Sequence, residues 1–181
     1  MANVPRRLAI TGCALAALAL AGCRRTPQSW IPVLEQTSTA FLETETEAVA
    51  SRVRSAAAHL PAEPESAAAD LAAAEQKLDH LLTYYLPLLE AREHSYNAYR
   101  HFYLGKTAET ERELEEVEKI LMETGAAGQG RLLTEMKDPL EHLEDARVAL
   151  QTDGGETAKA LQALATRLNF LLLKGGLVLA E

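Results

Sequence analysis

Apolar side chains recur at intervals of three and four residues between Leu71 and Tyr103, and this repeat limits the folds open to the chain. Such spacing places the side chains on one stripe of an α-helix, as in the buried face of a helical bundle. A half-buried strand would show strict alternation instead. The members of the stripe are Leu71, Ala74, Leu78, Leu81, Tyr85, Leu88, Arg92, Tyr96, Tyr99 and Tyr103.

The same period predicts further helices over residues 29–60, 107–125, 131–150 and 156–174. Asp138-Pro139 lies inside one of them, where it either starts a new helix or kinks a single one. Gly105 is expected to end the second helix and Gly175-Gly176 the last. In the first helix, the predicted buried stripe comprises Trp30, Leu34, Thr37, Phe41, Val49, Val53 and Leu60.

Pro87 lies inside the second helix, which is expected to start with Ser66 as its N-cap. Proline removes a backbone hydrogen bond and clashes with the preceding turn, so we expect a kink near Thr83 and Tyr84. The chain is therefore predicted to be all-α, an antiparallel helical bundle of four to five helices with a kinked long second helix. A single domain over residues 29–181 accounts for the whole pattern.

A short sequence repeat accompanies two of the predicted helix starts. Gly105-Lys106-Thr107-Ala108 and Gly155-Glu156-Thr157-Ala158 lie 50 residues apart, and Leu114 and Leu164 follow at the same offset. One interpretation is the duplication of a helical hairpin. The other is that Gly followed by Thr is a common way to restart a helix.

Residues 1–22 have the parts of a bacterial signal peptide. The basic residues Arg6 and Arg7 precede an apolar stretch over residues 8–20, which is too short to span a hydrocarbon layer of about 30 Å. The stretch ends in Leu20-Ala21-Gly22-Cys23. This sequence resembles the lipobox of bacterial lipoproteins, in which small residues precede the cysteine that receives the lipid.

The resemblance implies that residues 1–22 are removed and that Cys23 becomes a lipid-bearing N-terminus. It also implies diacylglycerol and commonly a third acyl chain, such as palmitate, on Cys23, and two or more chains make membrane attachment stable. Arg24 stands where Asp retains enterobacterial lipoproteins in the inner membrane, so the outer membrane, facing the periplasm, is expected. Residues 23–28 form a short tether.

Loss of the leader also removes Arg6, Arg7 and Cys13, which leaves 16 basic and 26 acidic side chains. This negative excess repels nucleic acid, so no nucleic-acid partner is expected. Cys23 is then the remaining cysteine, and a disulfide, a thiolate zinc site or a cysteine nucleophile is excluded from the mature chain. Phosphate-loop, dinucleotide-binding and Glu-x-x-His patterns are absent from the sequence, so no cofactor and no enzymatic activity are expected.

The second helix carries two sets of candidate binding residues. Glu90 and His94 share one helical stripe, and together with His142 from another helix they form a candidate site for Zn²⁺, Cu²⁺ or Ni²⁺. The alternative is a solvated polar stripe. A candidate small-ligand site at the kink, whose alternative is packing of the rings in the core, comprises Tyr85, Arg92, Tyr96 and Tyr99.

The segment 84–88, followed by a helix, Gly105 and a second helix, is similar to the YfdX-type helical proteins of the bacterial periplasm. That resemblance implies a stress-associated helical protein with no established chemistry. We expect a membrane-anchored helical lipoprotein that binds an envelope protein or acts as a scaffold. The alternative is a small-ligand or metal-binding bundle that uses the Tyr/His region. A broad exposed apolar groove would favour the first function, and a buried cavity at Tyr85, Arg92 and Tyr99 the second.

Overall fold

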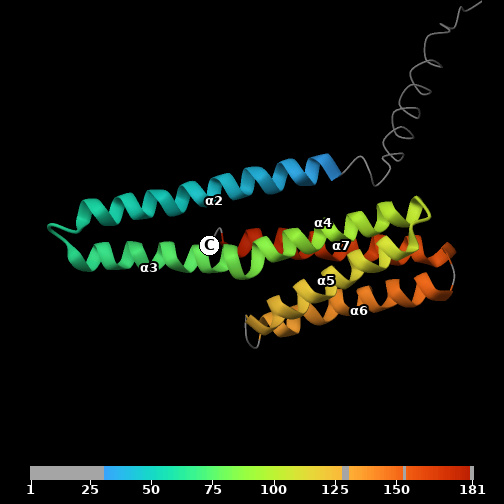
Figure 1. Cartoon of the computed structure of the whole chain (residues 1–181). Helices are drawn as coiled ribbons and strands as arrows, with labels where there is room; N and C mark the ends of the chain where they lie inside the picture. Colours follow the sequence, from blue (N-terminus) through green and yellow to red (C-terminus); the bar gives the residue numbers. More distant parts are fainter. Residues whose placement is uncertain (1–30, 128–130, 153, 180–181) are drawn as a thin grey trace, which may run out of the picture. The chain divides into compact units, whose positions relative to one another are not determined.

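A computed structural model describes residues 31–127, 131–152 and 154–179, and these residues are helical apart from short turns (Figure 1). The predicted signal peptide, Cys23 and the tether lie outside the described residues, as does Trp30. The described part of the chain begins with α2 (Ile31–His59), α3 (Pro64–His80) and η2 (Leu81–Tyr85), a π-helical turn. Four helices follow, α4 (Leu86–Tyr103), α5 (Thr107–Ala127), α6 (Arg131–Thr152) and α7 (Gly154–Leu179).

Helices α4 to α7 form a closed antiparallel bundle. Each of them packs against two of the others, in the cyclic order α4, α5, α6, α7 (Figure 1). Short connections between consecutive helices make neighbours antiparallel. The all-α prediction is thus confirmed, and α3, η2 and α4 together form the long second helix. Leucines with at most 1% of their surface exposed fill the core of the bundle, namely Leu88, Leu114, Leu121, Leu143, Leu161, Leu164, Leu168 and Leu171.

Gly105 ends α4, as the sequence predicts. Its backbone has a φ of 69°, in the left-handed region that glycine adopts without a steric penalty. The Gly105 N–H donates to the Phe102 carbonyl at 3.0 Å, and the Lys106 N–H donates to the His101 carbonyl at 3.0 Å. These two hydrogen bonds form a Schellman motif, which satisfies the last carbonyls of α4 and reverses the chain into α5.

The irregular turn lies where Pro87 predicts it. In η2 the Leu86 N–H donates to the Leu81 carbonyl, five residues earlier, and both Thr83 and Tyr84 belong to this turn. Pro87 has no N–H to donate and lies just after this turn, at the start of α4. A π turn holds one extra residue, so it rotates the helix that follows by about 100° relative to a continuous α-helix.

The predicted core is wrong on α3. Leu71 and Leu78 are 49% and 44% exposed, although they continue the stripe that is buried at Leu88 and Arg92 of α4. Unlike α4, helix α3 does not pack extensively against α5, α6 or α7, so its part of the stripe has no bundle helix opposite it. Tyr103 at the end of α4 is also exposed, and so are Val53 of α2 and Leu60, which directly follows α2.

Two predicted helix boundaries differ from the structure, and one of two alternatives is excluded. Pro139 does not start a new helix, because it lies inside the single helix α6. Gly175-Gly176 does not end α7, which continues to Leu179, since glycine inside a helix costs only about 1 kcal/mol. Helix α3 begins at Pro64, with Glu63 rather than Ser66 as its N-cap.

The buried positions of α5 and α7 do not follow the 50-residue offset of the short Gly-Thr sequence repeat. Leu114 and Leu164 are both fully buried, as the 50-residue offset suggests. The buried positions of α5 and α7 nevertheless match at an offset of 47, which pairs Thr110 with Thr157, both fully buried. The two hydroxyls also each donate to a backbone carbonyl, of Lys106 and of Ala149. The Gly-Thr echo therefore marks helix starts, and it is not the register of the packing.

Replacing Leu164 with alanine should reduce the free energy of unfolding by about 2–5 kcal/mol, because a fully buried leucine leaves a cavity in the bundle core. Leu173→Ala, in the same helix but 56% exposed, is the matched control and should change it by about 0.5 kcal/mol or less. Urea denaturation followed by circular dichroism measures both. Equal effects of the two substitutions would contradict the assignment of the core.

Candidate functional site

The tyrosines and Arg92 of the candidate ligand site take up separate environments. Tyr85 and Arg92 are buried in the packing of the long helix. The Tyr96 hydroxyl accepts a hydrogen bond from Asn169 Nδ2 of α7 at 2.7 Å, whereas the Tyr99 hydroxyl donates to that of Tyr103 at 3.2 Å. The structure therefore uses these residues in helix packing and in pairwise hydrogen bonds, in line with the packing alternative.

The hydrogen bond between Tyr99 and Tyr103 changes the acidity of one phenol. It raises the pKa of Tyr99 to about 12, because ionisation would remove the proton that Tyr99 donates, and partial burial acts in the same direction. A phenol with so high a pKa stays protonated at physiological pH. It has no tendency to act as a general base or as an anionic ligand there.

The candidate metal ligands also lie apart from one another. His94 faces α5, where its Nδ1 lies 2.7 Å from Glu113 Oε2, and the other oxygen of Glu113 lies 3.8 Å from His101 Nε2. His142 belongs to α6 and lies 4.0 Å from Asp138, and Glu90 is exposed. Within the described ranges, no group of three or more His, Cys, Asp or Glu side chains is arranged to hold a metal ion. The structure thus does not bring together Glu90, His94 and His142.

Glu113 is the residue that the sequence analysis missed in this cluster. It sits on α5 between two histidines of α4, and all three side chains are largely buried. Since α4 and α5 are antiparallel neighbours, this bridge ties them together at the end where Gly105 joins them. Only the pairing of the helices brings Glu113 to the histidines, because it is 19 residues from His94 in sequence.

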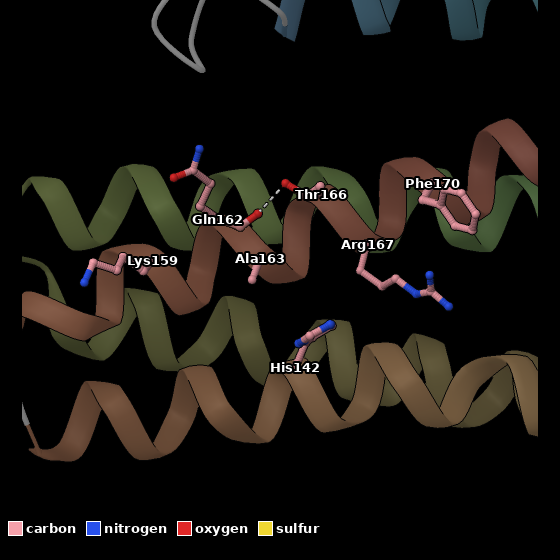
Figure 2. A pocket seen from close by; sticks show the side chains of 7 residues that line it. All are labelled: His142, Lys159, Gln162, Ala163, Thr166, Arg167 and Phe170. Atoms are coloured by element: carbon pink, nitrogen blue, oxygen red, sulfur yellow. Dashed lines mark hydrogen bonds between the residues drawn. The ribbon is translucent and has the colours of Figure 1, made fainter.

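An open hollow of about 570 Å³ lies on the outer side of α6 and α7 (Figure 2). His142 extends from α6 toward α7, and the Arg167 guanidinium lies over the Phe170 ring, 5.0 Å from its centroid. The complete lining is His142, Lys159, Gln162, Ala163, Thr166, Arg167 and Phe170.

Both long cations of this hollow have a carboxylate partner. Arg167 pairs with Asp138, and Lys159 Nζ lies 2.7 Å from Glu156 Oε1. The hydrogen bond to Glu156 raises the pKa of Lys159, so this amine remains protonated. An anionic ligand would have to compete with these carboxylates in an open, solvated site. The hollow therefore does not resemble a catalytic pocket.

A second feature involves the hairpin formed by α3 and the C-terminal half of α2, from Glu47 onward. Five large apolar side chains are 44–64% exposed there, which is unusual for residues with helical core spacing. We call them the apolar hairpin face; they are Val53, Leu60, Leu71, Leu78 and Leu82.

The positions that do pack inside this hairpin are small. Ala56 of α2 and Ala67 and Ala74 of α3 are at most 3% exposed, and Val49 joins them. Alanine burial removes little apolar area from water, so the two helices gain little stability from each other alone. A hairpin with a thin alanine core and exposed leucines is the pattern expected of a surface that another helix covers.

The other edge of the hairpin is polar and centred on Asp70. Its Oδ2 accepts a hydrogen bond from Ser55 Oγ at 2.7 Å and lies 3.3 Å from His59 Nδ1, and its Oδ1 lies 3.8 Å from Arg52. The Ser55 hydrogen bond, followed by His59 and Arg52, lowers the pKa of Asp70. This network links α2 to α3.

Sequence patterning pointed to the residues of the apolar hairpin face but assigned them to the core. The spacing of Leu71 and Leu78 is the same whether a stripe is covered by the chain itself or by a partner. No protein-family model, no curated protein and no solved structure matches the chain. None of the described helices combines the length and apolar composition that crossing a membrane requires.

The lowered pKa of Asp70 predicts a loss of stability in acid. The carboxylate stabilises the fold at pH values above its ordinary pKa of 3.8, and this contribution disappears as the pH falls through the lower folded value. We therefore expect Asp70→Asn to lower the melting temperature at pH 7 and to match the unsubstituted chain near pH 2. Thermal melts from pH 7 to pH 2 measure the difference.

Asp79→Asn is the matched control, because Asp79 is an exposed carboxylate on the same helix. It should leave the melting temperature nearly unchanged across this range. The role assigned to the Asp70 carboxylate would be contradicted if the difference in melting temperature between Asp70→Asn and the unsubstituted chain were as large at pH 2 as at pH 7.

Proposed function

We propose that this chain is a lipid-anchored protein of the bacterial cell envelope whose helical domain faces the periplasm and acts as a binding or scaffolding component. Cys23 carries the acyl chains, and the outer membrane is the proposed location. The apolar hairpin face is the surface through which the domain binds a protein.

The observation that carries the binding role is the exposure of Leu71 and Leu78 at helical core spacing. The bundle of α4 to α7 is closed around its own fully buried leucines, so the hairpin is not needed to complete that core. Exposed apolar side chains in a continuous row mark protein contact sites. Of the two functions considered from the sequence, a surface of this kind favours protein binding over a buried ligand cavity.

The anchor is supported by the sequence alone. A basic start, an apolar middle of 13 residues and Leu20-Ala21-Gly22-Cys23 occur in the order and at the distances that lipoprotein leaders have. The acidic excess of the rest of the chain fits a domain that is held beside an anionic membrane by its lipid and not by its protein surface.

If Cys23 is the lipidated residue, the chain expressed in bacteria will incorporate a radiolabelled or clickable fatty acid, and Cys23→Ser will abolish the incorporation. In membrane fractionation, the unsubstituted chain should be found with the membranes. The Cys23→Ser chain should lose the label and be either retained as the uncleaved precursor or released from the membrane. Gel fluorography of the labelled, immunoprecipitated chain gives the readout.

Cys13→Ser provides the matched control, since Cys13 is the other cysteine of the chain and belongs to the leader. It should label as well as the unsubstituted chain. Labelling that survives Cys23→Ser would overturn the proposed anchor.

The alternative function, metal binding at the Tyr/His region, would require that a divalent metal ion raise the melting temperature. We expect no rise with Zn²⁺, Cu²⁺ or Ni²⁺, because His94 faces α5 whereas His142 lies on α6 beside α7. A concentration-dependent rise of several degrees that His94→Ala removes would restore the metal hypothesis.

A further inference from the structure

The hairpin has a strict seven-residue pattern that separates its two edges. Val49 and Ala56 of α2 and Ala67 and Ala74 of α3 are buried. The residues four positions after these are Val53, Leu60, Leu71 and Leu78, and every one of them is exposed and apolar. The residues three positions after them are Arg52, His59, Asp70 and Lys77, and every one of them is polar.

The contacts of Asp70 show that the polar positions of the two helices lie on the same edge of the hairpin. Asp70 of α3 contacts Arg52 and His59 of α2, so the polar positions of the two helices share one edge. Positions three and four residues after a buried residue lie on opposite sides of it along a helix. The exposed valine and leucines of the two helices therefore share the other edge and form one continuous surface.

The composition around this surface argues against a lipid bilayer as its occupant. Helices that lie in a membrane interface carry lysine and arginine beside their apolar face. On α3 the exposed residues next to the leucines are Ala68, Ala72, Glu75 and Asp79, which anionic lipid headgroups would repel or leave uncontacted. On α2 the exposed Arg54 follows Val53, but its guanidinium is paired with Glu47.

A second surface of the same kind can cover this one. The exposed alanines Ala57, Ala58, Ala68 and Ala72 lie near its leucines, and such small residues can receive the leucines of another hairpin, as holes receive knobs. Two such hairpins face to face make four helices around a shared leucine core, the arrangement that α4 to α7 achieve within one chain. An isologous pair of this kind closes on itself and leaves no apolar row uncovered.

We infer that the apolar hairpin face is a homodimer interface, and that its occupant is the same hairpin of a second copy of this chain. This inference rests on the proposed function, because it names the partner for the binding surface. It makes the protein a self-associating scaffold, whose two bundles are joined through their hairpins.

The area available sets the strength of the association. Covering five half-exposed valine and leucine side chains and the neighbouring alanines on two copies buries roughly 1,200 Å², the lower end of the range for specific protein interfaces. The dimer is therefore expected to be concentration-dependent. Two chains anchored in one membrane meet at a high local concentration, which favours even a weak association.

The test is co-purification of two differently tagged full-length copies expressed in the same cells and solubilised in mild detergent. The unsubstituted copies should purify together. Leu71→Glu with Leu78→Glu in both copies should lower the recovery of the second tag at least tenfold, because four charges would be buried at one interface. Leu71→Ala with Leu78→Ala should lower it by a smaller factor.

The matched control is Leu104→Glu with Val148→Glu, which places two charges on exposed apolar residues, 61% and 50% exposed, at the far end of the bundle. Co-purification should be unchanged. Both residue pairs are exposed, so circular dichroism should show the same helical content in every variant. If the helical content changes in the Leu71→Glu and Leu78→Glu variant alone, the variant with Leu71→Ala and Leu78→Ala serves as the test of co-purification.

Three results would overturn the homodimer. The two unsubstituted copies do not co-purify; they co-purify equally well after substitution of the apolar hairpin face; or the face captures a different protein and no second copy. The Cys23→Ser chain separates this inference from the anchor. If Cys23→Ser copies still pair, the interface stands even where the anchor fails, and lipidation without pairing refutes the interface alone.

Discussion

Pro87 has no backbone N–H to donate, and the way the chain accommodates that missing donor determines how the rest of the structure is arranged. The π turn over residues 81–85 absorbs the irregularity without breaking the helix. One long helix can then serve two purposes. Its part after Pro87 packs into the bundle. Its part before the turn is linked to α2 through the hydrogen bond and ion pairs of Asp70.

This division separates two kinds of packing with different energetics. The bundle of α4 to α7 is filled with fully buried leucines, each of which removes a large apolar area from water. The hairpin is held by alanines and by the polar network around Asp70, while its valine and leucines stay exposed. The stable part of the chain is therefore complete by itself, and the weaker part offers a surface.

The candidate sites show how far residue type and spacing can predict a binding site when the tertiary structure is not known. Histidines and glutamates in one helical stripe suggested a metal site, but ligands must converge from several helices, and sequence spacing contains no information on which helices are adjacent. His94 pairs with Glu113 of α5, a residue to which the sequence analysis gave no role. Likewise, Tyr96 and Tyr99 form hydrogen bonds in different places, so their closeness in sequence does not make them a pocket.

Local information was sufficient for the helices, for the glycine that ends α4 and for the position of the irregular turn, because periodicity, positive φ and a missing N–H act within a few residues. The same information did not separate a stripe that the chain covers from a stripe that it exposes. Leu78 and Leu88 are equivalent in pattern, yet the first is 44% exposed and the second is fully buried. Burial depends on which helices lie opposite: Leu88 of α4 lies among the helices of the bundle, whereas Leu78 belongs to α3, which does not pack extensively against α5, α6 or α7. The resemblance of Leu20-Ala21-Gly22-Cys23 to a lipobox rests on the sequence alone, whereas the apolar hairpin face exists as a surface only in the tertiary structure.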